Sequence, residues 1–164
     1  TSLQGISCLS EIVDKLLSLR MYYDEYRPML LKVSPDLSHQ QLDEIIEYCL
    51  RSGIDGIVAG NTTRSRDGLT TISEKKIEEI GNGGMSGAPV YKKNLALVKY
   101  VHEKSEGILP IIGVGGIMSG EQAKEMLDAG ASLVEVYTGF IYEGPALIKN
   151  INKYLAEHDS APKK

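Results

Sequence analysis

The apolar residues of this chain follow two patterns that alternate along the sequence, and each pattern predicts one kind of element. Several long segments place an apolar residue at every third or fourth position, which is the spacing of one buried helix face. Capping boxes mark two helix starts, because Ser38 and Ser119 each precede a glutamine by three positions. Pro28 and Ser52-Gly53 end the first two helices. The expected helices cover residues 9–26, 38–51, 74–80, 94–104, 119–128 and 146–156.

Short apolar runs separate these helices, and we expect them to be strands buried on both faces. Strict alternation of helices and strands predicts an α/β fold with a parallel sheet and right-handed crossovers. The chain begins with a helix and no strand before it, whereas an open sheet normally begins with a strand. This order favours the C-terminal half of a (β/α)8 TIM barrel, with about four parallel strands and flanking helices, over a small open sheet. The expected strands cover residues 29–33, 56–59, 109–114 and 133–136.

Length and composition suit a single packed domain, since 42% of the 164 residues are hydrophobic. We expect the half-barrel to span residues 1–157 and a frayed polar tail to span residues 158–164. Residues 1–5 lack an initiator Met and the charged and apolar regions of a signal peptide, so the chain reads as if cut from a longer protein.

Charge and cysteine content exclude several classes of function. The net charge of −4 gives no case for binding nucleic acid or an anionic membrane surface. Cys8 and Cys49 lie far apart without metal or redox spacing, which favours a reducing compartment and predicts no metal site. No apolar run approaches the ~18 residues of a membrane span, so we expect a soluble chain.

Two of the expected strands end in turns with groups that can hold an anion. Gly113-Val-Gly-Gly116 leads toward the helix at 119–128, whose first N–H groups and dipole favour a phosphate. Tyr137-Thr138 follows the last strand, and in β/α barrels the loops after the last two strands form a shared phosphate site. The turn does not match a dinucleotide fingerprint, because its third glycine would fall at Met118. Tight packing of the glycines, with Thr138 as a cap, is the purely structural alternative.

The first two strands end in different chemistry. Lys32 lies among apolar neighbours, where an amine is costly unless it meets an anion or an electron-rich ring. Asn61-Thr62-Thr63 offers an amide and hydroxyls suited to an imide or ureide edge. An edge lysine that reaches water and a simple polar turn are the structural alternatives, and the turn is favoured on spacing alone. We assign no role to Glu135, the polar residue of the last strand. The stretch of about thirty residues that follows the second expected strand is long enough to be functional.

Five segments carry a specific combination of motifs across residues 28–155. They are Lys32-Val-Ser-Pro-Asp-Leu37, Ile54-Asp-Gly-Ile-Val-Ala-Gly-Asn-Thr-Thr63, Gly83-Gly-Met-Ser-Gly87, Leu109-Pro-Ile-Ile-Gly-Val-Gly-Gly116 and Gly130-Ala-Ser-Leu-Val-Glu-Val-Tyr-Thr-Gly139. As a set they resemble the C-terminal half of the barrel of dihydroorotate dehydrogenase. The Asn-Thr-Thr form and the Gly-Pro at 144–145 resemble its quinone-linked class.

This resemblance implies an FMN-dependent oxidation of dihydroorotate to orotate in pyrimidine synthesis, with a quinone as electron acceptor. It implies that Lys32 contacts the flavin ring and stabilises negative charge on its reduced form, and that Asn61 and Thr62 hold orotate. The family usually has Thr where this chain has Gly60, so only a backbone contact is expected there. The implied FMN-binding residues are Lys32, Gly60, Gly87, Gly116, Tyr137 and Thr138.

One expected part of the family's site is absent from this sequence. The proton-abstracting base of the family, Ser in the quinone-linked class, lies in an Asn-x-Ser-x-Pro-Asn loop that we expect before Thr1. Cys8 lacks that context and is treated as structural. The resemblance also assigns the quinone tunnel and a peripheral attachment to the cytoplasmic face of the membrane to the upstream half. We therefore expect the chain alone to be inactive.

Two alternatives remain at the level of sequence. One is a different FMN- or phosphate-binding barrel related to IMP dehydrogenase or dihydrouridine synthase, against which the Lys-Val-Ser-Pro-Asp and Asn-Thr-Thr motifs argue. The other is a non-catalytic half-barrel that associates with itself, because a half-barrel leaves two sheet edges and an apolar interior open.

Overall fold

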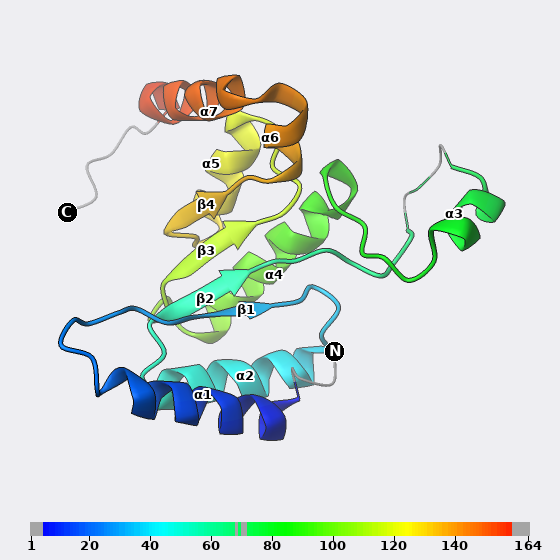
Figure 1. The fold of residues 1–164 in the computed structure, drawn as a ribbon. Coiled ribbons are helices and arrows are strands. Elements are labelled where there is room, and N and C mark those ends of the chain that lie inside the picture. The colour runs from blue at the N-terminus through cyan, green and yellow to red at the C-terminus, as the bar shows by residue number, and fades with distance from the viewer. Residues whose placement is uncertain (1–4, 68, 70–71, 159–164) are drawn as a thin grey trace.

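The computed structural model of the chain describes residues 5–67, 69 and 72–158. A parallel sheet of four strands lies at its centre, and the strands follow one another in chain order (Figure 1). Neighbouring strands pair as Leu31 with Ile57, Ile57 with Ile111 and Ile112 with Leu133. The predicted α/β class and the parallel sheet are confirmed. The strands are β1 (Leu30–Val33), β2 (Gly56–Ala59), β3 (Ile111–Val114) and β4 (Leu133–Glu135).

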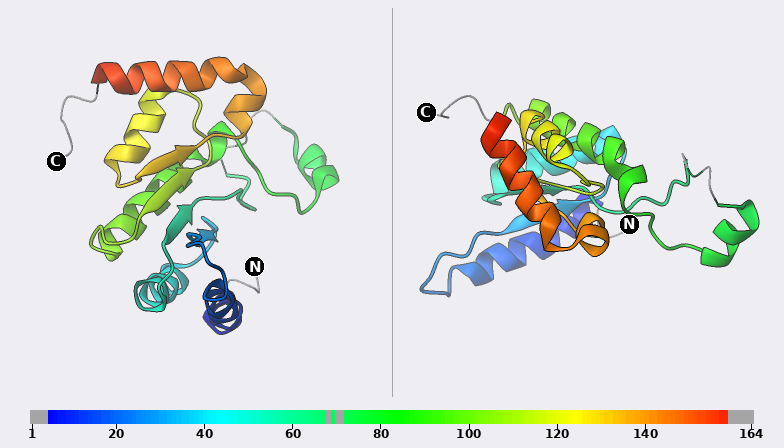
Figure 2. Two further views of the ribbon diagram at one scale, coloured as in Figure 1. Left: turned by 60° about the vertical axis from the view of Figure 1, so that its left-hand side comes forward. Right: turned by 90° about the horizontal axis from the view of Figure 1, so that it is seen from above.

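Helices form an arc around one side of this sheet (Figures 1 and 2). The pair α1 (Ile6–Arg20) and α2 (His39–Ser52) lies beyond β1, and α4 (Tyr91–Lys104) packs behind β2 and β3. At the other end α5 (Gly120–Asp128) packs against α7 (Pro145–His158). The short α3 (Glu74–Ile80) projects from the end of the sheet to which the strands point.

The hydrophobic core lies between the sheet and the helical arc. Ile57 of β2 and Ile111 of β3 are fully buried, and Val98 and Val101 of α4 cover them. The inner face of α2 carries the residues that its helical spacing predicts, namely Leu42, Ile45, Ile46 and Cys49. The two central strands are thus buried as expected.

The outer strands depart from the expectation that all strands are buried on both faces. Leu30 of β1 and Leu133 of β4 are exposed, the latter to 62%. β1 and β4 form the two edges of the sheet, where described residues provide neighbours on one side only. Val33 of β1 is nevertheless buried, so the exposure concerns the outward side chains of these edge strands.

The first helix is displaced from its predicted bounds, because α1 ends at Arg20 and not at residue 26. Asp55 explains the early end. Its carboxylate accepts hydrogen bonds from Arg20 Nη1 at 2.7 Å, from the Met29 N–H at 2.7 Å and from the Tyr26 hydroxyl. Residues between Arg20 and Met29 therefore turn back toward the start of β1 instead of continuing the helix.

Two further differences concern helix starts without side-chain caps. α4 begins at Tyr91, three residues earlier than expected, after a 3-10 turn at Ala88–Val90. The sequence interpretation missed α6 (Thr138–Glu143), whose N-cap residue Tyr137 makes no capping hydrogen bond. By contrast, Ser38 and Gln41 form the predicted capping box of α2.

The last helix reaches slightly beyond its expected end. α7 includes His158, whose ring stacks on Tyr154 with ring centroids 3.9 Å apart, so the helix runs one residue into the expected tail. Residues 159–164 of the expected tail lie outside the described residues. Residues 1–4, where we expected the chain to be cut from a longer protein, lie outside them too. Among the helices that the structure describes, none is long and apolar enough to cross a membrane.

Candidate active site

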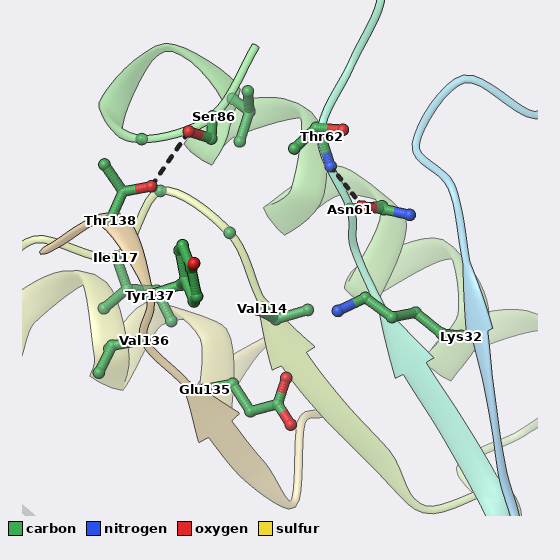
Figure 3. A pocket seen from close by; sticks show the side chains of 14 residues that line it. Lys32, Asn61, Thr62, Ser86, Val114, Ile117, Glu135, Val136, Tyr137 and Thr138 are labelled. Carbon is green, nitrogen blue, oxygen red and sulfur yellow. Dashed lines mark hydrogen bonds between the residues drawn. The ribbon is translucent and has the colours of Figure 1, made fainter. Parts of the chain in front are cut away.

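A cavity of about 570 Å³ opens at the end of the sheet to which all four strands point (Figure 3). Parallel α/β folds gather ligand-binding groups at this end, because each strand there passes into a loop that is free to vary. The lining comes from β1 at one side to the segment after β4 at the other. The lining residues are Lys32, Asn61, Thr62, Ser86, Gly87, Val90, Val114, Gly115, Gly116, Ile117, Glu135, Val136, Tyr137 and Thr138.

Lys32 and the turn after β2 form one wall of this cavity. Lys32 is exposed, and its amine is directed toward Val114 in the middle of the sheet (Figure 3). The Asn61 Oδ1 accepts a hydrogen bond from the Thr62 N–H at 2.8 Å. This contact fixes the side-chain amide of Asn61, a lining residue of the cavity, with its nitrogen turned away from Thr62 (Figure 3).

The opposite wall combines three loops. Gly116 lies so close to the start of α4 that a Cβ at that position would be 2.6 Å from the Tyr91 nitrogen. Thr138 donates a hydrogen bond from Oγ1 to Ser86 Oγ at 3.1 Å, which joins the segment after β4 to the loop before α4 (Figure 3). The wall therefore offers closely approachable backbone and hydroxyl groups, which suit a phosphate.

Capping contacts occupy part of the start of α5, the helix end that we expected to favour a phosphate. At α5 the Ser119 hydroxyl accepts from the Gln122 N–H, and Gln122 Oε1 accepts from the Met118 N–H at 2.7 Å. The N–H groups of Met118 and Gln122 thus already have side-chain acceptors. The short α6 begins at Thr138, which lines the cavity.

Asp36 holds the loop that follows Asn61 and Thr62. Its Oδ1 accepts from Thr63 Oγ1 at 2.5 Å and from Lys93 Nζ at 2.5 Å, and its Oδ2 accepts from the Arg64 N–H at 2.7 Å. Burial by itself would raise the pKa of this carboxyl, but the hydrogen bonds from Lys93, Thr63 and Arg64 outweigh it and lower the pKa below its ordinary value. The sequence interpretation included Asp36 in a motif without giving it a role of its own, and it did not single out Lys93.

Most of the residues singled out from the sequence meet at this cavity. Gly60 is the exception, because it is buried behind the wall and does not line the cavity. Lys32 is exposed, which removes the argument that burial alone makes its amine costly. The residues that the structure brings together are Lys32, Asn61, Thr62, Gly87, Gly116, Tyr137 and Thr138.

Sequence reasoning missed other lining residues. Glu135 received no role, yet its carboxylate is directed into the cavity from β4 (Figure 3). The alternation of a strand carries the only signal for it, since Glu135 is the polar position of an otherwise apolar run. Ser86 lies in a quoted motif, but its partner Thr138 is 52 positions away, and spacing gives no sign of such a pair.

The fold defines this chain as half of a TIM barrel, with its cavity at the carboxyl ends of the strands. The chain belongs to the dihydroorotate dehydrogenase family, whose sequence pattern it matches over residues 3–158. The resemblance found in the sequence is thereby confirmed.

Individual relatives agree with this assignment. The chain is 47% identical over 155 residues to the dihydroorotate dehydrogenase (quinone) of Christiangramia forsetii, a match that covers 94% of the chain and 44% of the relative. It is 44% identical over 150 residues to the enzyme of the same name from Proteus mirabilis, covering 90% of the chain and 43% of the relative. The chain therefore spans less than half the length of these relatives.

A solved structure gives the same result for the fold. Ligand-free dihydroorotate dehydrogenase from Eimeria tenella superposes with a TM-score of 0.86 at 30% sequence identity. The match covers 95% of this chain and 46% of that protein. The half-barrel architecture predicted from the order of elements is consistent with these shares.

Proposed function

We propose that this chain is the FMN- and orotate-binding half of a quinone-linked dihydroorotate dehydrogenase, which oxidises dihydroorotate to orotate in pyrimidine synthesis. The observation that carries the proposal is the convergence, at one cavity, of the lysine, the Asn-Thr turn and the glycine turns that the family resemblance singles out. The names of the relatives support the quinone as electron acceptor.

The cavity fits a flavin mononucleotide. A phosphate group suits the wall of Gly87, Gly116 and Thr138, because a side chain at Gly116 would collide with Tyr91 and the backbone stays accessible. The Lys32 amine reaches into the middle of the cavity, where it would stabilise negative charge on a flavin ring. When bound, FMN supplies the hydride-accepting chemistry of the reaction.

Asn61 and Thr62 are the proposed substrate contacts. An orotate ring presents alternating C=O and N–H groups on one edge, and the Asn61 amide can satisfy both kinds. The hydrogen bond to the Thr62 N–H orients that amide before any ligand arrives. Such pre-ordering lowers the entropic cost of binding.

Gly60 keeps a smaller proposed role. Its carbonyl and N–H are the only groups that could contact a cofactor, and it lies behind the lining residues. The FMN contacts of the chain then rest mainly on Lys32, Gly87, Gly116 and Tyr137-Thr138.

Proton abstraction is assigned to a group outside this sequence. The 164 residues contain no Asn-x-Ser-x-Pro-Asn loop, and general acid-base catalysis needs a base within hydrogen-bond reach of the substrate carbon. We propose that the chain binds and orients the ligands, and that the base, the quinone tunnel and any membrane attachment belong to the remainder of the enzyme. The chain alone would then not turn over dihydroorotate.

Flavin titration tests the proposal directly. Adding FMN to the purified chain is expected to quench flavin fluorescence saturably, and orotate is expected to perturb the absorbance of the loaded chain. Lys32→Ala should weaken FMN binding, whereas Lys75→Ala should not, because Lys75 is exposed on α3 and does not line the cavity. Unsaturable binding, or equal effects of the two substitutions, would contradict the proposal, and turnover by the chain alone would contradict the assignment of the base.

A second candidate role is self-association through the two sheet edges. The observation that favours it is the exposure of apolar edge residues, Leu30 of β1 and Leu133 of β4. In a pair of copies related by a two-fold axis, β4 of each copy could pair with β1 of the other and close a barrel of parallel strands. Such a pair would have no role in the oxidation reaction.

A further inference from the structure

Asn94 is a buried polar residue that belongs to no part of the site described above. It lies in the first turn of α4, its exposure is 0%, and it does not line the cavity. A buried amide is costly unless its donor and acceptor are both satisfied. Its partners therefore indicate what the position requires.

Both hydrogen bonds of the Asn94 side chain go to the backbone of one residue, Asn61. The Asn94 Nδ2 donates to the Asn61 carbonyl oxygen at 3.2 Å, and the Asn94 Oδ1 accepts from the Asn61 N–H at 3.4 Å. The two hydrogen bonds hold the peptide groups on both sides of the Asn61 Cα. Rotation of this residue about its backbone would break at least one of them.

The side chain of Asn94 occupies the space between the turns after β2 and β3. A Cβ at Gly60 would be 2.6 Å from Asn94 Oδ1 and 2.1 Å from the Val114 carbonyl oxygen. A Cβ at Gly115 would be 2.2 Å from Asn94 Nδ2. Any side chain at either glycine would displace the Asn94 amide from the Asn61 backbone, so these three positions form one matched set.

We propose that Asn94 is a positioning residue, which aims the Asn61-Thr62 turn at the substrate without touching the substrate itself. The inference rests on the proposed function, because it gives that turn an orotate ligand. Asn94 holds the Asn61 backbone, and the Asn61 side chain is then oriented by its bond to the Thr62 N–H. The direction in which the Asn61 amide meets a ligand thus depends on a residue buried behind it.

The test compares Asn94→Leu with Val98→Ala in the full 164-residue chain. Leucine has a similar volume but leaves the Asn61 N–H and carbonyl without partners. Val98 is equally buried, at 0% exposure, one turn further along α4, so its truncation controls for lost core packing. Asn94→Ala serves as the second variant if the leucine variant does not fold.

Two readouts distinguish positioning from simple core stability. Hydrogen exchange of the Asn61 backbone N–H, measured by NMR, is expected to accelerate in Asn94→Leu and to stay unchanged in Val98→Ala. Each variant is measured at the same number of degrees below its own melting temperature. The dissociation constant of orotate from the FMN-loaded chain is expected to rise about tenfold in Asn94→Leu. In Val98→Ala that constant should change less than about twofold, since an aliphatic side chain makes no hydrogen bond to the turn.

The outcomes separate this inference from the proposed function. Equal exchange rates of the Asn61 backbone N–H in the two variants overturn the role of Asn94. An equal effect of both substitutions on orotate affinity overturns it as well. If the unmodified chain binds FMN but no orotate, the proposed substrate contacts fail. Exchange at Asn61 then decides the positioning role by itself.

Discussion

The carboxylate of Asp36 accepts hydrogen bonds from three residues, Thr63, Arg64 and Lys93. Together with Asn94 it holds the segment after β2 from two sides. Asn94 forms hydrogen bonds with the backbone of Asn61, and Asp36 accepts hydrogen bonds from Thr63 and Arg64. At the scale of single residues, the geometry of the candidate substrate turn thus depends on two side chains that do not line the cavity.

Asp36 gives a prediction on acid stability. Its pKa is lowered in the folded chain from an ordinary value of 3.8, because the hydrogen bonds outweigh the opposing effect of burial. The unfolded chain therefore binds this proton more readily, and the stabilisation is present above pH 3.8 and lost as the pH falls through the lower folded value. Asp36→Asn is expected to flatten this acid limb of the stability curve, measured by urea unfolding at a series of pH values.

A matched control for Asp36→Asn is Asp128→Asn. Asp128 also pairs with a lysine, Lys124, but at an exposed i,i+4 position of α5. Exposed pairs of this kind contribute little to stability. An acid limb that is equally steep in unmodified protein and in Asp36→Asn would show that Asp36 does not carry the effect.

At the scale of elements, tertiary contacts decide where α1 ends and β1 begins. Asp55 precedes β2, and it collects Arg20 from the end of α1, Tyr26 from the connection and the Met29 N–H before β1. Arg20 also lies over the Tyr26 ring, 4.9 Å from its centroid. One side chain thus joins α1, the connection and the sheet at the end opposite the cavity.

Removal of the Asp55 carboxylate should loosen this junction. Asp55→Ala leaves the Met29 N–H and Nη1 of Arg20, a side chain that is only 20% exposed, without their acceptor. We expect a loss of about 2 kcal/mol in the free energy of unfolding, from urea denaturation. Glu11→Ala, which removes an exposed pair with Lys15, should change it by less than about 0.5 kcal/mol. Similar losses in both variants would contradict the role of Asp55.

At the scale of the whole molecule, the open sheet edges are the main feature. The helices cover one side of the sheet, and β1 and β4 form its edges among the described residues (Figure 2). Unpaired strand groups and exposed apolar side chains favour association with a further strand. Either the remainder of a longer enzyme or a second copy of the chain would satisfy these groups.

Size-exclusion chromatography with light scattering tests the second case. The isolated chain is expected to form a concentration-dependent dimer, and Leu133→Lys should shift it toward monomer because a charge at the β4 edge opposes pairing. Ile80→Lys is the control, since Ile80 is 55% exposed but lies on α3, away from both edges. A monomer at all concentrations would contradict self-association.

The sequence by itself determined the order of the strands and of every α-helix except α6, the parallel α/β class and the family. These depend on local signals, such as the capping box of Ser38 with Gln41, the apolar face of α2, and motifs whose residues lie close together along the chain. The same motifs singled out Lys32, Asn61 and Thr138, which line one cavity in the structure.

Only the tertiary structure decided which residues act together across long separations. The end of α1 depends on Asp55, which is 35 positions from Arg20, and the hold on Asn61 depends on Asn94, 33 positions away. α6 begins without a capping side chain, so no local pattern announced it. Contacts of this kind arise when folding brings distant segments to the same end of the sheet, and the periodicity of a sequence records only which face of an element is buried.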